Sequence, residues 1–194
     1  MGKKKAGRIV TAVLRHSPEF LGLTCDKQGY VEVEALINAL NNKGITADKE
    51  LIETIGANER FSFNEKHTKI RADYGHSIGL KLDDMYTPSE PPEYLYHGTY
   101  TEALDNIKKI GIIRFPKMEK ARDHIFLTDN INVALKKGGR HGNSVALSIR
   151  TKQMHKDGYK LYHVKNDIWL TESTIFPEFI DFNHIVYDTE KRGE

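Results

Sequence analysis

The chain has 194 residues, of which 39% are hydrophobic and 29% charged, and its formal net charge is +2. This composition is ordinary for a globular protein, and so small a charge does not by itself indicate a nucleic-acid partner. No apolar run approaches the roughly 20 residues that span a bilayer, so we expect a cytoplasmic protein with no membrane partner. The single cysteine, Cys25, excludes an internal disulfide and a cysteine-built zinc site.

Residues 1–72 carry the pattern of three helices followed by a hairpin. Apolar residues recur at helical spacing, and Pro18 should end the first helix shortly after Arg15 and His16. The predicted helices lie near 9–14, 33–40 and 51–55, and alternating side chains predict strands at 60–63 and 69–72. This order is typical of a winged helix, which binds nucleic acid in some proteins and docks proteins in others.

A proline-rich, acidic stretch at residues 83–92 has the composition of a linker. Because proline fixes φ and removes a backbone donor, we expect this stretch to run extended over the surface. We therefore predict an N-terminal lobe over 1–85, a linker over 86–93 and a C-terminal lobe over 94–194.

The C-terminal lobe has the pattern of many short strands and few helices. Apolar residues predict a helix over 103–110, closed by Gly111. Strands are predicted near 94–96, 125–127, 145–149, 160–164, 168–170 and 185–187. The pattern favours a split β-sheet over a doubly wound parallel sheet, which makes the fold class α+β. No GxGxxG fingerprint and no Walker A sequence occurs, so a dinucleotide would bind through another fold.

Two basic segments in the first lobe could carry chemistry. Arg15 and His16 could simply cap the negative end of the first helix, or they could clamp a phosphate, with arginine supplying a planar fork and histidine a proton. The loop that runs from Arg71 to Ser77 follows a predicted strand, and Gly75 permits a tight turn before His76 and Ser77. It could be an ordinary turn or an anion site.

Two further segments lie in the second lobe. Gly138-Gly139-Arg140-His141-Gly142 could be a flexible loop, or its glycines could let the backbone approach a ligand closely. His97-Gly98-Thr99 lies at the end of a predicted strand, where a lone histidine is more often structural than catalytic. No histidine–carboxylate spacing such as HExxH is present, so we predict no metal site. No GxSxG elbow occurs either.

Taken in order, these segments resemble the RNA 2′-phosphotransferase (KptA) family. The resemblance covers about residues 9–180. This chain departs from the family pattern at two places: it has Asp73-Tyr74 where the family often has Asn-Gln, and Phe126 where the family often has His. The motifs that carry it are Leu14-Arg15-His16-Ser17-Pro18-Glu19 with Leu21-Gly22-Leu23 and Gly29-Tyr30-Val31, Ile70-Arg71-Ala72 with Gly75-His76-Ser77, Leu95-Tyr96-His97-Gly98-Thr99, Arg140-His141-Gly142 and Trp169-Leu170-Thr171.

The resemblance implies a winged-helix lobe, a lobe of ADP-ribosyltransferase type and a set of site residues. It implies that Arg15, His16, Arg71 and Arg140 form a catalytic tetrad. It further implies that the substrate RNA meets Arg15, His16, Arg71, His76 and Ser77, and that NAD⁺ meets His97, Gly98, Thr99, His124 and Arg140. We expect a monomer that acts on 2′-phosphorylated RNA, with a tRNA splice junction as the family's usual substrate.

The implied reaction has two steps. The RNA 2′-phosphate attacks C1″ of NAD⁺ and releases nicotinamide, which gives an ADP-ribosylated 2′-phosphate. The ribose 2″-OH then attacks the phosphorus, which frees the RNA 2′-OH and ADP-ribose 1″,2″-cyclic phosphate. A phosphate monoester has a second pKa of about 6, so the nucleophile is already ionised and needs no general base. The arginines would stabilise the phosphoryl charge, and His16 would orient groups or transfer a proton.

Two alternatives remain open. An ADP-ribosyltransferase that caps phosphorylated nucleic-acid ends would stop after the first step. A winged-helix nucleic-acid-binding protein with a degenerate second lobe would bind no NAD⁺.

Overall fold

The computed structural model of the chain describes residues 3–114, 122–139 and 142–188. It has the mixed α+β composition predicted from the sequence, and its contacts divide it into two compact units. The N-terminal unit comprises Met1–Met85 and Pro116–Asp123, and the C-terminal unit comprises Tyr86–Phe115 and His124–Glu194. The first unit is therefore discontinuous in sequence.

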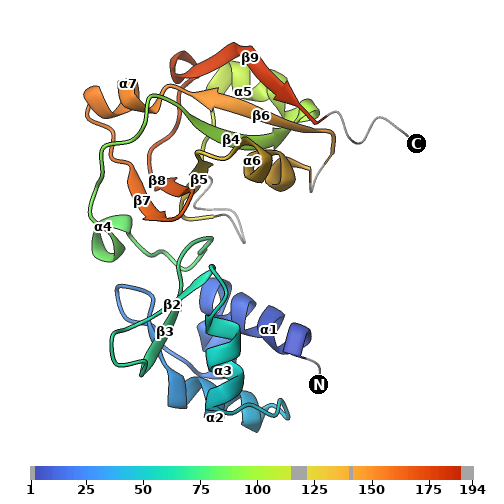
Figure 1. Cartoon of the computed structure of the whole chain (residues 1–194), viewed down its shortest axis with the longest axis vertical. Helices are drawn as coiled ribbons and strands as arrows, with labels where there is room; N and C mark the ends of the chain where they lie inside the picture. The colour runs from blue at the N-terminus through green and yellow to red at the C-terminus, as the bar shows by residue number, and fades with distance from the viewer. Residues whose placement is uncertain (1–2, 115–121, 140–141, 189–194) are drawn as a thin grey trace. The chain divides into compact units, whose positions relative to one another are not determined.

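Three longer helices, the short helix α4 (Leu82–Met85) and a small antiparallel sheet make up the described part of the N-terminal unit (Figure 1). The helices are α1 (Lys3–His16), α2 (Val33–Asn42) and α3 (Lys49–Gly56), with a 3₁₀ turn η1 (Pro18–Leu21) after α1. The strands are β1 (Val31–Glu32), β2 (Phe61–Phe63) and β3 (Lys69–Ala72), in the order β1-β3-β2. The three predicted helices and both predicted strands are confirmed, whereas two-residue β1 is too short to show an alternating pattern.

Local sequence explains where these helices begin and end. Asp48 caps α3, because its side chain accepts a hydrogen bond from the Leu51 N–H at 2.8 Å. Pro18 opens the 3₁₀ turn after α1, so α1 ends at His16 as predicted. The apolar faces of the helices meet over Ile70 of β3, which is fully buried. This packing fixes the C-terminal end of α1 next to the loop that follows β3.

A six-stranded antiparallel sheet forms the centre of the C-terminal unit, in the order β7-β8-β5-β4-β6-β9 (Figure 1). Its strands are β4 (Leu95–Tyr100), β5 (Ile125–Thr128), β6 (Ser144–Ile149), β7 (Tyr162–Lys165), β8 (Ile168–Thr171) and β9 (Ile180–Tyr187). The helices are α5 (Leu104–Ile110), α6 (Ile131–Gly138) and α7 (Thr151–Lys156), and short 3₁₀ turns lie at η2 (Thr101–Ala103) and η3 (Pro177–Phe179). The predicted strands and α5 are confirmed, but α6 and α7 were not predicted.

The proline-rich stretch at residues 83–92, which we expected to be extended, is only partly so. Residues Leu82–Met85 form a short helix, α4, with Leu82 and Met85 buried, so the expectation of an extended chain was wrong there. Apolar side chains at both ends of this turn favour burial over an extended surface course. Further along, the Ser89 N–H donates to Leu161 O at 2.8 Å, and the Thr151 hydroxyl donates to Pro92 O at 2.8 Å. These bonds attach residues 89–92 to the C-terminal unit.

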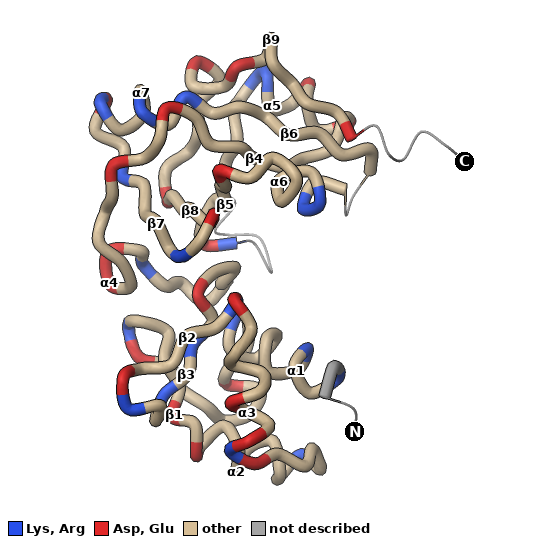
Figure 2. Tube along the Cα trace, in the orientation of Figure 1, with Lys and Arg blue, Asp and Glu red and all other residues tan. Residues whose placement is uncertain are grey.

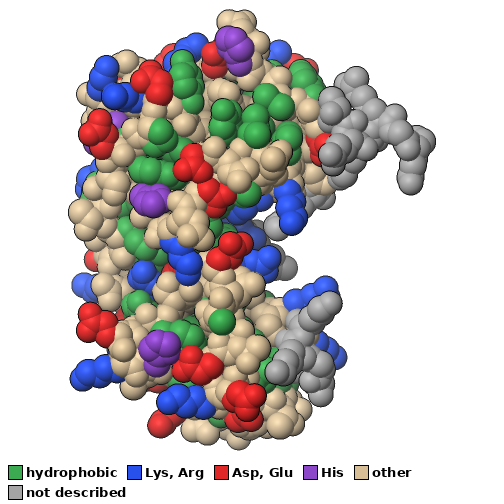
Figure 3. Space-filling view, in the orientation of Figure 1, with side chains coloured by type: hydrophobic (Ala, Val, Ile, Leu, Met, Phe, Trp, Pro, Cys, Tyr) green, Lys and Arg blue, Asp and Glu red, His purple; other side chains and the backbone are tan. Residues whose placement is uncertain are grey.

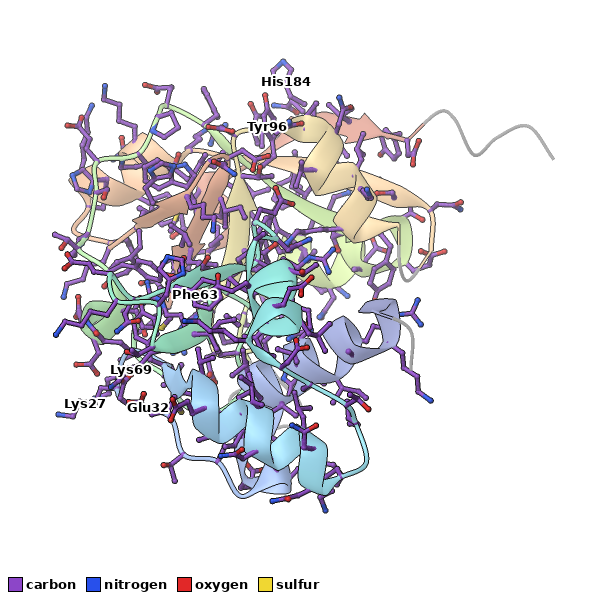
Figure 4. The ribbon with its side chains drawn as sticks, turned by 60° about the horizontal axis from the view of Figure 1, so that its bottom comes forward. Lys27, Glu32, Phe63, Lys69, Tyr96 and His184 are labelled. Carbon is purple, nitrogen blue, oxygen red and sulfur yellow. The ribbon has the colours of Figure 1, made fainter. Side chains whose placement is uncertain are left out.

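Charges of both signs are mixed on the surface of the described residues. Figure 3 shows lysine and arginine side chains interspersed with aspartate and glutamate on one face. In the N-terminal unit, the Lys69 ammonium lies 3.4 Å from Asp26 and 3.5 Å from Glu32, and Figure 4 labels Lys69 and Glu32. Such exposed pairs contribute little to stability. Among the described residues, no helix has the length and apolarity to cross a membrane.

Candidate functional site

The loop after β3 is attached to the C-terminal end of α1. The Ser77 N–H donates to Arg15 O at 2.9 Å, which satisfies a carbonyl that the end of the helix leaves without an intrahelical partner. Gly75 has a φ of 84°, which other residues rarely adopt, and it turns the chain so that Ser77 can reach α1. Two predicted segments, Arg15-His16 and the loop ending at Ser77, are therefore brought together.

Asp123 and Arg122 hold the other side of this loop. The Asp123 carboxylate accepts hydrogen bonds from the N–H groups of Ile78 (3.0 Å) and Gly79 (2.9 Å). The Asp123 N–H donates to His76 O at 2.8 Å, and the Arg122 guanidinium donates to Gly75 O. The loop is thus held by α1 on one side and by Arg122 and Asp123 on the other. Arg122 and Asp123 are more than forty positions away from the loop in the sequence.

Both ring nitrogens of His16 form hydrogen bonds within the unit. Nδ1 lies 2.8 Å from the Ser77 hydroxyl, and Nε2 lies 2.9 Å from Nη1 of Arg122. A guanidinium can only donate, so Nε2 accepts and the ring proton resides on Nδ1. Burial lowers the pKa of His16, the charges of Arg122 and Arg15 lower it further, and Asp123 opposes them. His16 is therefore a neutral imidazole of defined tautomer.

Arg15 presents donors that no described residue uses. Its guanidinium stacks on the ring of Tyr74, with 4.8 Å between the guanidinium carbon and the ring centroid. Nε and Nη2 are buried and have no hydrogen-bond partner among the described residues. Burial lowers the pKa of Arg15, Tyr74 opposes this, and the nearby charges of Arg122 and Arg60 add to the lowering. Buried, unused N–H donors on a cation are suited to binding an anion.

Arg71 is buried on β3 and supported from three directions. Its Nε lies 3.5 Å from Oδ1 of Asp73, its Nη1 donates to Gln28 O at 3.2 Å, and its guanidinium lies 4.8 Å from the ring centroid of Tyr30. Asp73 in turn accepts a hydrogen bond from the Ser62 hydroxyl at 2.9 Å. Asp73 and Tyr74, which both depart from the family pattern, thus each contact an arginine of the predicted tetrad.

His76 and Ser77 occupy different environments. His76 is fully buried, with Nε2 3.7 Å from where a Cβ on Gly29 would lie. Ser77 is half-buried and bonds to His16. His76 is accordingly part of the buried interior of the unit, whereas Ser77 helps to orient His16 through a hydrogen bond.

Two arginines converge next to Gly75. A Cβ built on Gly75 would lie 3.4 Å from Cζ of Arg15 and 3.4 Å from Nη1 of Arg122. Two guanidinium groups this close repel one another unless an anion lies with them. With the unused donors of Arg15, this arrangement has the chemistry of a phosphate site within the N-terminal unit. Other Lys and Arg residues lie along α1 (Figure 2).

In the C-terminal unit, His97 lies within β4 rather than at the end of a strand. Its Nδ1 is 2.9 Å from Phe126 O. A carbonyl oxygen can only accept, so Nδ1 carries the proton and Nε2 is left as an acceptor. Burial lowers the pKa of His97, the bond to Phe126 opposes this, and the charge of Lys137 adds to the lowering. The Lys137 ammonium lies 3.0 Å from the ring centroid of Phe126.

Gly98 and Gly138 allow β4 and α6 to pack closely. A Cβ on Gly98 would overlap the carbonyl oxygen of Ala134 in α6. A Cβ on Gly138 would overlap the carbonyl oxygen of Thr99, which is itself buried. From the sequence, the segment that begins at Gly138 could be a flexible loop or a loop that approaches a ligand. Gly138 is instead the last residue of α6, and its missing side chain allows the helix to pack on the strand.

The remaining predicted residues divide between described and undescribed parts of the chain. His124 is buried, with Nε2 3.7 Å from the Glu172 carboxylate. Arg140 and His141 lie outside the described residues. No group of three or more His, Cys, Asp or Glu among the described residues could hold a metal ion.

Sequence reasoning missed Arg122 and Asp123 as parts of the site. Both belong to the N-terminal unit, although they follow β4 and α5 of the C-terminal unit along the chain. The available signal was a basic cluster ending at Arg122, which has no spacing relation to His16.

Comparison with known proteins gives consistent results. Residues 2–173 match the sequence model of the RNA 2'-phosphotransferase, Tpt1 / KptA family. A Flavobacterium johnsoniae protein named "Probable RNA 2'-phosphotransferase" is 38% identical over 92% of this chain and 96% of its own length. Proteins with the same name from Fusobacterium nucleatum and Escherichia coli are 39% and 34% identical, over 87% and 90% of this chain and 92% and 93% of their own lengths.

Proposed function

Because the chain belongs to the RNA 2'-phosphotransferase, Tpt1 / KptA family, we propose that it is an NAD⁺-dependent enzyme that removes an internal 2′-phosphate from RNA. The observation that carries this proposal is the pair of guanidinium groups at Gly75, with buried unused donors on Arg15. A 2′-phosphate monoester carries the negative charge that would offset the two guanidinium groups and the oxygen acceptors that would bind the unused Arg15 donors. In this proposal, the N-terminal unit is a winged helix and the C-terminal unit is of ADP-ribosyltransferase type.

Arg15, His16 and Arg71 would act on the phosphate. Arg15 would donate its unused N–H groups to the phosphoryl oxygens, and such donors typically contribute about 3–4 kcal/mol each to a transition state. Arg71 is held by Asp73, so it would add charge stabilisation without the cost of becoming ordered. His16 is held as a neutral ring with both nitrogens hydrogen-bonded, which suits an orienting role. Arg140 would complete the tetrad.

The β4 residues are compatible with NAD⁺. His97 uses Nδ1–H internally and presents a neutral Nε2 acceptor, which could take a hydrogen bond from a hydroxyl or amino group of the adenosine. Thr99 and His124 would contribute further contacts, whereas Gly98 would act mainly through its packing on α6. NAD⁺ supplies the electrophilic ribose carbon that accepts the RNA phosphate. The expected products are 2′-OH RNA, ADP-ribose 1″,2″-cyclic phosphate and nicotinamide.

Product analysis tests the proposal directly. The protein is incubated with NAD⁺ and an oligoribonucleotide bearing one internal 2′-phosphate, and the products are separated by chromatography. A reaction without NAD⁺ and one with the unphosphorylated oligonucleotide serve as controls. The proposal predicts NAD⁺-dependent formation of 2′-OH RNA and the cyclic phosphate. Stable ADP-ribosylated RNA would instead indicate an enzyme that stops after the first step, and unchanged RNA would refute the proposal.

A further inference from the structure

Arg122 makes a contact that the predicted tetrad does not include. It belongs to the N-terminal unit, and its Nη1 lies 2.9 Å from Nε2 of His16 while the same group donates to Gly75 O. The neighbouring Asp123 bonds to two backbone N–H groups and one backbone carbonyl of the same loop. Arg122 is therefore anchored beside His16 by its own chain neighbour.

This contact determines which form of His16 is stable. An Nδ1-protonated ring donates to Ser77 and accepts from Arg122, so both bonds are satisfied. The other neutral tautomer would place an N–H against a guanidinium N–H. A protonated ring would do the same and would also add a third positive charge beside Arg15 and Arg122. Only one of the three forms fits the observed partners.

We propose that Arg122 is a positioning residue of the phosphate site, holding His16 as the neutral Nδ1–H tautomer and placing a second guanidinium beside Arg15. The identification of the anion as an RNA 2′-phosphate rests on the proposed function, but the effect on His16 does not. Two guanidinium groups and a neutral imidazole match the two charges of a phosphate monoester better than the single charge of a phosphodiester. Arg122 thus contributes to the selection of a monoester over the phosphodiester backbone.

The groups that face His16 make the inference testable through its titration. Arg15 and Arg122 disfavour protonation of His16, Asp123 favours it, and burial disfavours it. Removing Arg122 should therefore raise the pKa of His16 and allow both neutral tautomers. A lysine at position 122 keeps the charge and can still donate, so it should largely restore the original behaviour.

The deciding measurement is ¹⁵N NMR of the histidine ring nitrogens across a pH titration. The His16 signals are assigned by their loss in His16→Asn. We compare the unmodified protein with Arg122→Met, Arg122→Lys and the control Arg60→Met, which removes another cation near Arg15. We expect a protonated Nδ1 and an unprotonated Nε2 in the unmodified protein and in Arg60→Met, and mixed tautomers with a raised pKa in Arg122→Met. Identical His16 spectra in Arg122→Met and the unmodified protein would overturn the inference.

Binding gives a second readout. By calorimetry, Arg122→Met should bind a 2′-phosphorylated oligoribonucleotide about tenfold more weakly than the unmodified protein, while affinity for the unphosphorylated oligonucleotide stays the same. Equal losses for both oligonucleotides would overturn the selectivity argument. If Arg122→Met does not fold, as judged by thermal unfolding, Arg122→Gln takes its place. It removes the charge, so the pKa of His16 should rise and the phosphate selectivity should fall, while its N–H donor should keep the Nδ1–H tautomer. If the unmodified protein transfers no phosphate, the proposed function fails while the NMR result on His16 still stands.

Discussion

Asp73 and Arg71 form a buried ion pair two residues apart, with Oδ1 of Asp73 3.5 Å from Nε of Arg71. A buried charge that loses its partner is costly, whereas an exposed one is not. The pair therefore links the stability of the N-terminal unit to the arrangement of a proposed catalytic arginine.

Asp73→Ala should lower the free energy of unfolding by about 3 kcal/mol, because it leaves Arg71 without its carboxylate in a buried position. The matched control is Glu32→Ala, which removes a carboxylate from an exposed pair with Lys69 and should cost less than about 1 kcal/mol. Urea denaturation measures both. Equal effects in the two variants would contradict the assignment of Asp73 as a buried support.

Arg71→Ala should abolish 2′-phosphate release, and we expect it to destabilise the protein as well because Asp73 loses its counter-ion. The double variant Arg71→Ala/Asp73→Asn removes the unpaired charge and should regain stability without regaining activity. Chemical denaturation and product analysis on the same preparations separate the two effects. Near-normal turnover in the stable double variant would remove Arg71 from the proposed tetrad.

Gly98→Ala should destabilise the C-terminal unit by about 3 kcal/mol or more, because the new methyl group would overlap the carbonyl oxygen of Ala134. Gly158→Ala is the control: its Cβ would have nothing within 4 Å, and only its positive φ of 89° opposes the change. Thermal unfolding compares the two. If Gly98→Ala lost NAD⁺ binding at unchanged stability, direct ligand contact would be favoured over packing.

His97 should make the protein less stable as the pH falls. Its pKa is lowered in the folded state by burial, so below the ordinary value of 6.5 the unfolded chain binds a proton that the folded chain resists. The free energy of unfolding should therefore decrease as the pH drops through 6.5 and continue to decrease until His97 protonates in the folded protein. His97→Asn, which can still donate to Phe126 O, should reduce this dependence. An unchanged pH profile in that variant would show that His97 does not contribute to it.

Much of the fold could be predicted from periodicity, and the exceptions have physical causes. The three N-terminal helices and β2 and β3 follow from apolar spacing and from Pro18. Helix α6 was missed because Gly138-Gly139, at its C-terminal end, has the sequence of a flexible loop. In the structure, Gly138 packs against the backbone of Thr99 in β4, where a side chain would not fit. A single sequence gives no indication that a glycine is needed for contact with a distant strand.

The candidate site was predictable only where its residues lie close together in sequence. Arg15 and His16 are adjacent at a helix end, and the segment from Arg71 to Ser77 leaves a predicted strand. Arg122 is 106 residues from His16, and no periodicity relates them. Long-range contacts of this kind depend on the path of the whole chain.

The discontinuity of the N-terminal unit affects how the protein can be divided. A fragment ending at Met85 would keep each helix and strand described for the unit but would lack Arg122 and Asp123. Its loop from Gly75 to Gly79 would lose the carboxylate that binds two of its N–H groups, and Nε2 of His16 would lose its donor. The N-terminal unit is thus not contained in one continuous stretch of sequence, because the hydrogen bonding of its His16 depends on a segment that follows the first strand and helix of the other unit.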